Sequence, residues 1–280
     1  MNILITGIYG FLGYNLANEL VKEHNVVGVY NKNKNNSLNK NIITCNSLDS
    51  LHVEPDVVIM CHAAVASGEH LITELELKKS NVYLTKQIIE KFSTTPCVYI
   101  SSVSVYRTNG TQISERSEEK PLSDYAKSKL LAENIVRSNP KNKIIRVSSL
   151  YGIGMKENTL IPNYCKQALQ FKKIEVWGNG SRFQNYIHVL DLVELIKDVI
   201  NTNQEINFPI LAVDAKEYSN LEVAKIISDF TLSEIEFVKE DFSTSVHYNN
   251  ELTRKALHWR PRVSLELGIK KYLEWRRKQF

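Results

Sequence analysis

Short apolar runs alternate with stretches of helical periodicity through the first half of this chain. Runs rich in Val, Ile and Leu occupy residues 2–7, 25–30, 42–45, 56–64, 97–102 and 143–149. Apolar side chains recur at helical spacing over residues 11–24, 76–92 and 124–138. Strands and helices that alternate in this order predict a parallel sheet with helices on both faces. The strand runs are almost continuously apolar, which is typical of a sheet covered on both sides.

The alternation stops after about residue 152, where Gly, Pro and Asn interrupt the sequence. One more helix of the first unit is predicted at 187–202, followed by short strands at 206–213 and 235–240 and a closing helix at 265–280. We therefore expect an α/β protein with a doubly wound parallel sheet and a smaller C-terminal α/β substrate lobe. The expected boundaries are 1–152 and about 185–203 for the first domain, and about 153–184 and 204–280 for the lobe.

Composition excludes several classes of protein. Apolar residues make up 43% and charged residues 24% of 280 positions, which is typical of a soluble globular chain. The net charge of +4 is spread along the sequence, so we expect no nucleic-acid partner. No apolar run is long enough to cross a membrane or to direct export, and we expect a cytoplasmic protein. The cysteines lie far apart without metal-ligand spacing, which predicts reduced thiols and no metal site, at Cys45, Cys61, Cys97 and Cys165.

A glycine pattern directly follows the first predicted strand. Gly7, Gly10 and Gly13 form GxxGxxG at the junction between that strand and the next helix. Glycines let the backbone turn tightly and approach a pyrophosphate, while the helix N-terminus offers free N–H groups. A lone glycine pattern is weak evidence, but its position between strand and helix favours dinucleotide binding over a plain tight turn.

A tyrosine and a lysine lie four residues apart on the helix predicted at 124–138. This spacing puts Tyr125 and Lys129 on one helix face, and Ser102 ends the preceding strand. A nearby ammonium stabilises a phenolate and lowers the pKa of the phenol. The three side chains therefore predict proton transfer at an alcohol or carbonyl, with Tyr125 as acid–base, Lys129 as electrostatic partner and Ser102 as hydrogen-bond donor. The alternative for YxxxK alone is a surface helix.

These motifs together resemble the extended short-chain dehydrogenase/reductase family. The likeness is carried by TGIYGFLG at 6–13, YISSVSVY at 99–106, YAKSK at 125–129 and RVSSLYGIG at 146–154. It continues through 174–192 and 256–269, so it covers nearly the whole chain in family order. Members of this family include UDP-galactose 4-epimerase and related nucleotide-sugar epimerases, dehydratases and 4-ketoreductases.

The resemblance implies a Rossmann-type domain, a bound NAD or NADP, and a sugar nucleotide in the cleft between the two parts. It also implies a homodimer through a four-helix bundle built from helices at about 80–92 and 124–137. The cofactor residues that it implies are Gly7, Tyr9, Gly10, Phe11, Leu12, Gly13, Tyr30, Asn31, Lys32, Asn46, Ser47, Ala63, Ala64, Asn81, Tyr125 and Lys129.

Three departures from the family pattern concern the substrate. Family dehydratases place an acidic pair just after the catalytic Ser or Thr, whereas this chain has Val103 and Ser104. Water elimination then lacks its usual proton donor and acceptor, and we expect a 4,6-dehydratase to be disfavoured. The family's phosphate-contacting Arg corresponds to Gln184, and Arg182, two positions earlier, is a candidate for the missing charge. Ser149 stands where relatives often use Asn near the diphosphate. The alternative for Arg182 is a surface arginine.

A further departure concerns the choice of cofactor. NAD-preferring relatives carry Asp at the place of Tyr30, where a carboxylate accepts hydrogen bonds from the ribose 2′-OH and repels a 2′-phosphate. Its absence predicts that NADP is bound at least as well as NAD, with Asn31, Lys32 and Lys34 as donors to the phosphate. The alternative is a solvated loop that touches nothing. His62 beside the cofactor run and His188 in the family-like stretch are interpreted as structural.

The sequence leaves three functions open. A nucleotide-sugar epimerase that transfers hydride at a sugar carbinol, most often C4, is slightly favoured over an NADPH-dependent reductase of 4-keto-6-deoxysugar nucleotides. A third hypothesis is a non-catalytic NAD(P)-binding sensor, which the intact Ser102, Tyr125 and Lys129 disfavour.

Overall fold

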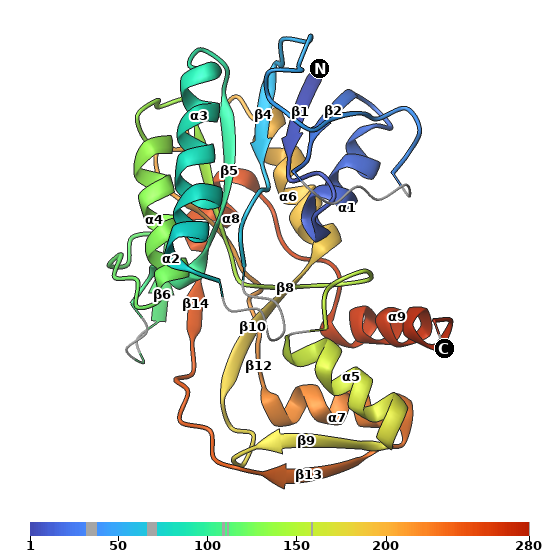
Figure 1. Ribbon diagram of the computed structural model, residues 1–280. Coiled ribbons are helices and arrows are strands. Elements are labelled where there is room, and N and C mark those ends of the chain that lie inside the picture. The colour runs from blue at the N-terminus through green and yellow to red at the C-terminus, as the bar shows by residue number, and fades with distance from the viewer. Residues whose placement is uncertain (32–37, 66–71, 108–109, 111, 158, 280) are drawn as a thin grey trace.

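The computed structural model describes residues 1–31, 38–65, 72–107, 110, 112–157 and 159–279. A seven-stranded sheet flanked by helices forms one part of the molecule, and a smaller lobe forms the other (Figure 1). The sheet order is β3-β2-β1-β4-β5-β7-β11, and every pairing is parallel. These strands are β1 (Asn2–Thr6), β2 (Asn25–Val29), β3 (Ile43–Cys45), β4 (Val57–Met60), β5 (Cys97–Ser102), β7 (Lys143–Val147) and β11 (Ile210–Ala212). The predicted doubly wound parallel sheet is confirmed.

Alternate side chains of each strand enter two separate cores, one on each face of the sheet. Ile3 and Ile5 of β1 pack in the core shared with α1 (Phe11–Leu20) and α6 (Val189–Asn201). Leu4, between them, packs in the opposite core with α3 (Leu84–Lys91) and α4 (Asp124–Val136). Successive side chains of a strand point to opposite faces, so a strand covered on both sides has to be apolar throughout.

The helix predicted at 76–92 is interrupted. It consists of α2 (Glu74–Leu77), a π-helical turn η1 (Lys78–Tyr83) and α3, which follow one another without a break in the chain. A π turn holds one more residue than an α turn, and such turns occur frequently at functional sites. The apolar periodicity of this segment gave no sign of the insertion.

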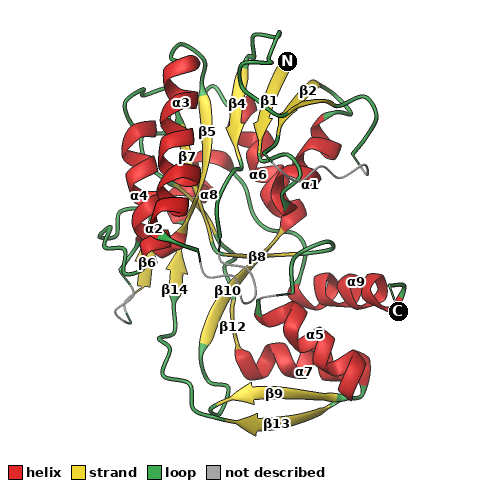
Figure 2. Ribbon diagram, in the orientation of Figure 1, coloured by secondary structure: helices red, strands yellow, loops and turns green. Residues whose placement is uncertain are grey.

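The smaller lobe has its own hydrophobic core. The helices α5 (Leu160–Phe171), α7 (Asn220–Thr231) and α9 (Leu265–Arg277) pack around residues that include Ile174, Tyr186 and Ile227 (Figure 2). Its strands are β8 (Ser149–Tyr151), β10 (Phe183–His188) and β12 (Glu217–Ser219) in one sheet, and β9 (Lys173–Trp177) with β13 (Glu234–Val238) in another. The strands β6 (Gln112–Ser114) and β14 (His247–Asn249) form a further pair, and α8 (Glu251–Leu257) follows β14.

One expected boundary differs from the structure. The strand predicted at 206–213 was expected in the smaller lobe, but β11 pairs with β7 and so completes the seven-stranded sheet. Its side chains Ile210 and Ala212 join the core of α1 and α6. A three-residue strand far along the chain carries too little pattern to show which sheet it joins.

Within the described part of the chain, no helix is both long and apolar enough to span a membrane.

Candidate active site

The glycine loop after β1 is shaped by contacts that leave no room for side chains. Gly7 has a φ of 69°, and a Cβ on it would lie 2.9 Å from the backbone of His62. A Cβ on Gly13 would lie 2.4 Å from the carbonyl oxygen of Gly7. The left-handed turn and the close approach of α1 to the loop therefore both require glycine.

A fourth glycine, which the sequence pattern did not single out, lies in β2 and makes room for a side chain of the loop. Gly28 of β2 faces Ile8, and a Cβ on Gly28 would come within 2.0 Å of the Ile8 side chain. Ile8 is fully buried and so fixes the loop to the sheet. Gly10 is the N-cap of α1, and among the described residues no side chain caps this helix and no acid lies in its first turn. Its N-terminal N–H groups are thus available to an anion.

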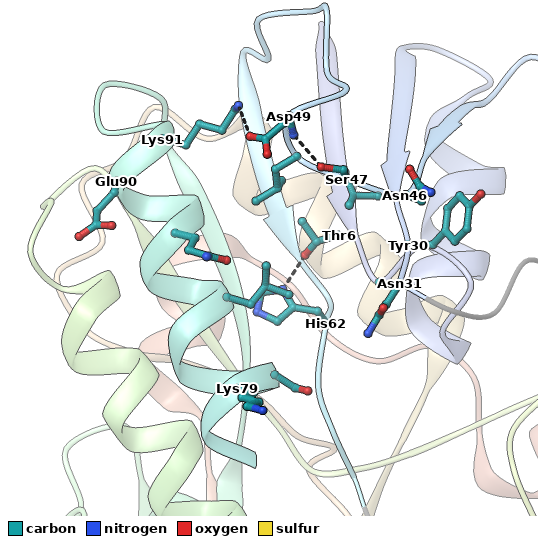
Figure 3. Close-up of a pocket in the computed structure, with 16 residues that line it drawn as sticks. Thr6, Tyr30, Asn31, Asn46, Ser47, Asp49, His62, Lys79, Glu90 and Lys91 are labelled. Carbon is teal, nitrogen blue, oxygen red and sulfur yellow. Dashed lines mark hydrogen bonds and ion pairs between the residues drawn. The ribbon is translucent and has the colours of Figure 1, made fainter. Parts of the chain in front are cut away.

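A cavity of about 690 Å³, here called the cofactor-side cavity, opens at the carboxyl ends of β1, β2 and β4 (Figure 3). The strand order reverses between β1 and β4, and ligands of doubly wound sheets bind at such a point. Five of the predicted cofactor residues line it: Gly7, Tyr30, Asn31, Asn46 and Ser47. Lining residues that the sequence did not predict for the cofactor include Thr6, Asp49, His62, Lys79 and Lys91.

The other predicted cofactor residues surround this cavity or lie beyond it. Tyr9 packs edge-on against Tyr30 with 5.1 Å between ring centroids. Phe11, Leu12 and Gly13 form the first turn of α1 after Gly10. Ala63 and Ala64 follow β4, and the Ala64 N–H donates to the side-chain oxygen of Asn81 at 2.7 Å. Lys32 and Lys34 lie outside the described residues. The glycine turn, the uncapped helix and the adjacent cavity fit a dinucleotide.

Ser102 and Tyr125 come together at the carboxyl edge of the sheet. Ser102 is the last residue of β5, and Tyr125 lies in the first turn of α4, which begins after the cap Ser123. Burial raises the pKa of Tyr125 to about 12, and a hydrogen bond with Ser102 acts in the opposite direction. Two hydroxyl groups placed in this way can move a proton on an oxygen atom that approaches both of them.

Lys129 lies one turn further along α4 and is almost completely buried. Its ammonium donates to the Ile100 carbonyl at 2.7 Å and lies 4.1 Å from the centroid of the Tyr99 ring. Burial lowers the pKa of Lys129 to about 7, while the charge of Glu133 acts in the opposite direction. The expectation that Lys129 lowers the pKa of Tyr125 is wrong for this structure, because burial of the phenol dominates and the ammonium is directed to a carbonyl and a ring.

A buried ion-pair cluster that the sequence did not predict supports this helix face. Glu133 continues the spacing of Tyr125 and Lys129, four residues on, and pairs with Arg146 of β7. Arg146 Nε donates to Glu133 at 3.0 Å, and the Ser101 hydroxyl donates to the same carboxylate at 2.5 Å. Ser101 and Arg146 are register partners in neighbouring strands. The cluster therefore fixes α4 to the strand that ends in Ser102.

A second cavity, here called the substrate-side cavity, lies in the smaller lobe and has a volume of about 340 Å³. All three residues predicted for the substrate, Ser149, Arg182 and Gln184, line it. Tyr186 also lines it, and among the described residues the Nε of Arg182 and the hydroxyl of Tyr186 are buried without a hydrogen-bond partner. Gln184 donates to Asn220 at 2.7 Å. Two unpaired polar groups around one cavity fit a ligand rich in hydrogen-bonding groups.

His188 agrees with the structural interpretation. It is the N-cap of α6, where its Nδ1 accepts from the Leu190 N–H at 3.3 Å, and its ring packs against Tyr151 at 5.1 Å. Burial lowers the pKa of His188 to about 4, so the ring is neutral at physiological pH.

The sequence matches the NAD dependent epimerase/dehydratase family over residues 3–210. It is 25% identical to an uncharacterized UDP-glucose epimerase YtcB of Bacillus subtilis, over 96% of each chain. It is 26% identical to a mouse dTDP-D-glucose 4,6-dehydratase, over 99% of this chain and 89% of the relative. The fold is similar to a UDP-glucuronic acid 4-epimerase from Bacillus cereus solved with UDP-glucuronic acid and NAD, with a TM-score of 0.87, 20% identity and full coverage of both chains.

The expectation that disfavoured a 4,6-dehydratase is wrong. Dehydratases of this name from mouse, Dictyostelium discoideum and human are 26%, 27% and 25% identical to this chain, over 82% or more of it. The exclusion rested on Val103 and Ser104 alone, which form a short 3-10 turn in which Ser104 donates to the Ser102 hydroxyl at 2.9 Å. Acid and base groups reach a substrate from any element around a cleft, so two adjacent positions do not exclude elimination.

Proposed function

Because the chain belongs to the NAD-dependent epimerase/dehydratase family, we propose that it oxidises and reduces a carbinol of a nucleotide sugar, at C4. The observation that carries the proposal is the placement of Ser102 at the end of β5 and of Tyr125 and the buried Lys129 on α4, at the sheet edge that also bears the cofactor-side cavity. The resemblance to extended short-chain dehydrogenases/reductases is confirmed by the family match and by the relatives named above.

In this proposal each residue has a defined task. Tyr125 takes the proton from the sugar hydroxyl as the alcohol is oxidised and returns it when the carbonyl is reduced. Ser102 donates a hydrogen bond to the same oxygen and holds it beside the phenol. The cofactor, when bound, accepts and returns the hydride. Lys129, which is also among the expected cofactor residues, would contact the cofactor from the helix face that carries Tyr125.

The glycine loop would hold the cofactor pyrophosphate, and the cofactor-side cavity would take the adenosine. We propose NADP as a cofactor at least equal to NAD, because Tyr30 and Asn31 line this cavity where a carboxylate would repel a 2′-phosphate. This feature also supports the second candidate function, an NADPH-dependent reductase of keto-sugar nucleotides.

On the substrate side, Arg182 would bind the diphosphate in place of the arginine that Gln184 replaces. Arg182 lines the substrate-side cavity, and its Nε has no hydrogen-bond partner among the described residues. A phosphate oxygen would satisfy this group with a charge-assisted hydrogen bond. Ser149 and Gln184 line the same cavity and would contact the neighbouring nucleotide or sugar.

A homodimer through a four-helix bundle fits the exposed apolar side chains on the helices of this face. Leu75 of α2, Tyr83 of η1 and Leu131 of α4 are 57%, 52% and 48% exposed. α3 and α4 run side by side on one side of the sheet (Figure 1). Leu131→Glu would dissociate the dimer in sedimentation experiments, whereas Leu232→Glu, which changes an 89% exposed residue outside these helices, would not.

A panel of UDP- and dTDP-sugars, offered with NAD, NADP or NADPH and followed by NMR, tests the function. Epimerised product without net cofactor consumption identifies an epimerase. A 4-keto-6-deoxy product identifies a dehydratase, and stoichiometric loss of NADPH with a keto-sugar identifies a reductase. If the cofactor binds and no sugar reacts, the proposal fails and a sensor role gains support.

A further inference from the structure

A continuous line of buried hydrogen bonds runs from the glycine loop to the helix that carries Tyr125. Thr6, the last residue of β1 before Gly7, bonds to His62 Nδ1 at 2.7 Å. His62 Nε2 bonds to the Thr85 hydroxyl at 3.1 Å, and that hydroxyl donates to the Asn81 carbonyl at 2.7 Å. These bonds join β1, the end of β4 and α3.

The line continues into α4. The side-chain amide of Asn81 donates to the Ser128 hydroxyl at 2.9 Å, and Ser128 donates to the carbonyl of Tyr125 at 2.7 Å. Asn81 is the buried residue of the π turn η1, so the side chain that bonds to α4 comes from this turn. The side-chain oxygen of Asn81 also accepts from Ala64 at 2.7 Å, which ties the segment after β4 to the same point.

The donors and acceptors of this line have only one consistent arrangement. The Thr85 hydroxyl has a single proton, which it donates to Asn81, so it accepts from His62 Nε2–H. His62 Nδ1 then accepts from Thr6. Burial, and secondarily the charge of Lys129, lowers the pKa of His62 to about 3, and the ring is neutral across the physiological range.

The five side chains Thr6, His62, Thr85, Asn81 and Ser128 are each at most 8% exposed, so bulk water has little access to replace these bonds. A change at one of them therefore leaves buried groups unpaired and moves the elements that they join. The two ends are functionally distinct: Thr6 and His62 line the cofactor-side cavity, and Ser128 holds the backbone of Tyr125.

We propose that His62 is a positioning residue: as the neutral Nε2–H tautomer it couples the glycine loop, through Thr85, Asn81 and Ser128, to the first turn of α4. The hydrogen bonds thereby fix the position of the acid–base Tyr125 relative to the cofactor site. This inference rests on the proposed function for its effect on turnover, but the coupling itself is a property of the fold. It replaces the interpretation of His62 as a histidine that merely packs under the loop.

The first test is the state of the ring. In protein labelled with nitrogen-15 at histidine, we expect His62, assigned by its loss in His62→Gln, to remain the neutral Nε2–H tautomer from mildly acidic to mildly basic pH. A protonated ring or the Nδ1–H tautomer in this range would overturn the proposal. This measurement needs neither cofactor nor substrate.

The second test compares Thr85→Val with Thr85→Ser. Valine keeps the shape and removes the hydroxyl, whereas serine keeps the hydroxyl and serves as the matched control. With cofactor bound, we expect slowed hydrogen exchange over the first turn of α4 in wild type and Thr85→Ser, and faster exchange there in Thr85→Val. Cofactor affinity should be unchanged in both. We expect kcat of Thr85→Val to fall about 10- to 100-fold with KM unchanged, as misplaced catalytic groups do.

These experiments distinguish a failure of the proposed function from a failure of the proposed coupling through His62. If wild type turns over no nucleotide sugar, the proposed function fails, and the tautomer and the exchange pattern still decide on the coupling. If Thr85→Val melts earlier but matches Thr85→Ser in exchange over α4, in kcat and in its pH profile, His62 is only structural and the inference is overturned.

Discussion

The two cavities differ in how their polar groups are satisfied in the absence of a ligand. Among the described residues, those lining the cofactor-side cavity have no buried side-chain nitrogen or oxygen atom without a hydrogen-bond partner. His62, for example, is bonded on both ring nitrogens. The substrate-side cavity contains two such unpaired atoms, on Arg182 and Tyr186. The first cavity is preorganised by its own hydrogen bonds, whereas the second has groups that a polar ligand would satisfy.

This difference follows from the elements that form each cavity. The cofactor-side cavity lies at the ends of parallel strands, where close backbone contacts at Gly7 and Gly13 set the shape of the adjacent loop. The substrate-side cavity draws its residues from β8, β10 and α5, with the longer side chains of Arg182 and Tyr186. Backbone contacts tolerate almost no change, while long side chains can be exchanged to suit another ligand.

The sharpest test of this comparison is Tyr125→Phe. This change should lower the turnover rate and leave ligand binding in both cavities unchanged. Loss of the phenolic hydroxyl removes the acid–base, and turnover should fall by about 10²- to 10⁴-fold. Equilibrium titrations should give unchanged affinities for cofactor and nucleotide sugar. Full turnover in Tyr125→Phe would disprove the catalytic assignment.

Arg182→Gln should affect the substrate side alone. Removal of a hydrogen bond from a charged group costs about 1.5–3 kcal/mol, which is roughly a 10- to 150-fold loss of affinity for a nucleotide sugar. Cofactor affinity should not change. Arg260→Gln, at an exposed arginine, is the matched control. Equal affinities for the sugar in the two variants would remove Arg182 from the binding site.

Lys129→Met should change activity and stability in opposite directions: we expect it to abolish turnover and to stabilise the fold at and below neutral pH. The pKa of Lys129 is about 7 in the folded protein, whereas an unperturbed lysine has a pKa of 10.5, so between these values the unfolded chain holds the proton more often. The stability of wild type should therefore rise with pH through this window, and the charged lysine should destabilise the fold below it, by about 1.4 kcal/mol per pKa unit at most.

Denaturant unfolding at several pH values measures this effect. Lys129→Met without cofactor should be more stable than wild type at and below neutral pH, with a flatter dependence on pH up to about 10, and it should be inactive. A variant less stable than wild type at every pH would contradict the low pKa of Lys129.

Tyr30→Asp should give the smallest effect, a change of cofactor preference. The new carboxylate should repel a 2′-phosphate and shift the ratio of NADP to NAD affinity by about tenfold toward NAD, or about 1.4 kcal/mol. Tyr30→Phe keeps the aromatic contact with Tyr9 and should leave the ratio unchanged. A clear preference of wild type for NAD would contradict the proposed role of this position.

The sequence was sufficient for features that depend on neighbours along the chain. The sheet, the glycine turn at Gly7 and the positions of Ser102 and Tyr125 follow from strand–helix alternation and motif order. It was insufficient where distant contacts decide. The partner of Gly28 is Ile8, and the partner of His62 is Thr85, in another element. Sequence patterns do not report such contacts.

The pKa values of the site residues also depend on contacts between distant elements, which the sequence pattern does not report. The spacing of Tyr125 and Lys129 correctly predicted one helix face, but the pKa of the phenol is raised because burial outweighs the hydrogen bond with Ser102. Burial depends on how α4 packs against β5 and β7, which a helix pattern alone does not contain. The dehydratase expectation failed for a similar reason, because two residues were taken to represent the entire cleft.

The most direct test of the central claim is a single experiment on the protein loaded with NAD or NADP. A nucleotide sugar from the panel is added, and the near-ultraviolet absorbance of the reduced nicotinamide is followed. We predict that the band appears on mixing in wild type and not in Tyr125→Phe, whichever product forms. Absence of the band and of any product in wild type, with the cofactor and the sugar shown to be bound, would contradict hydride transfer at this site.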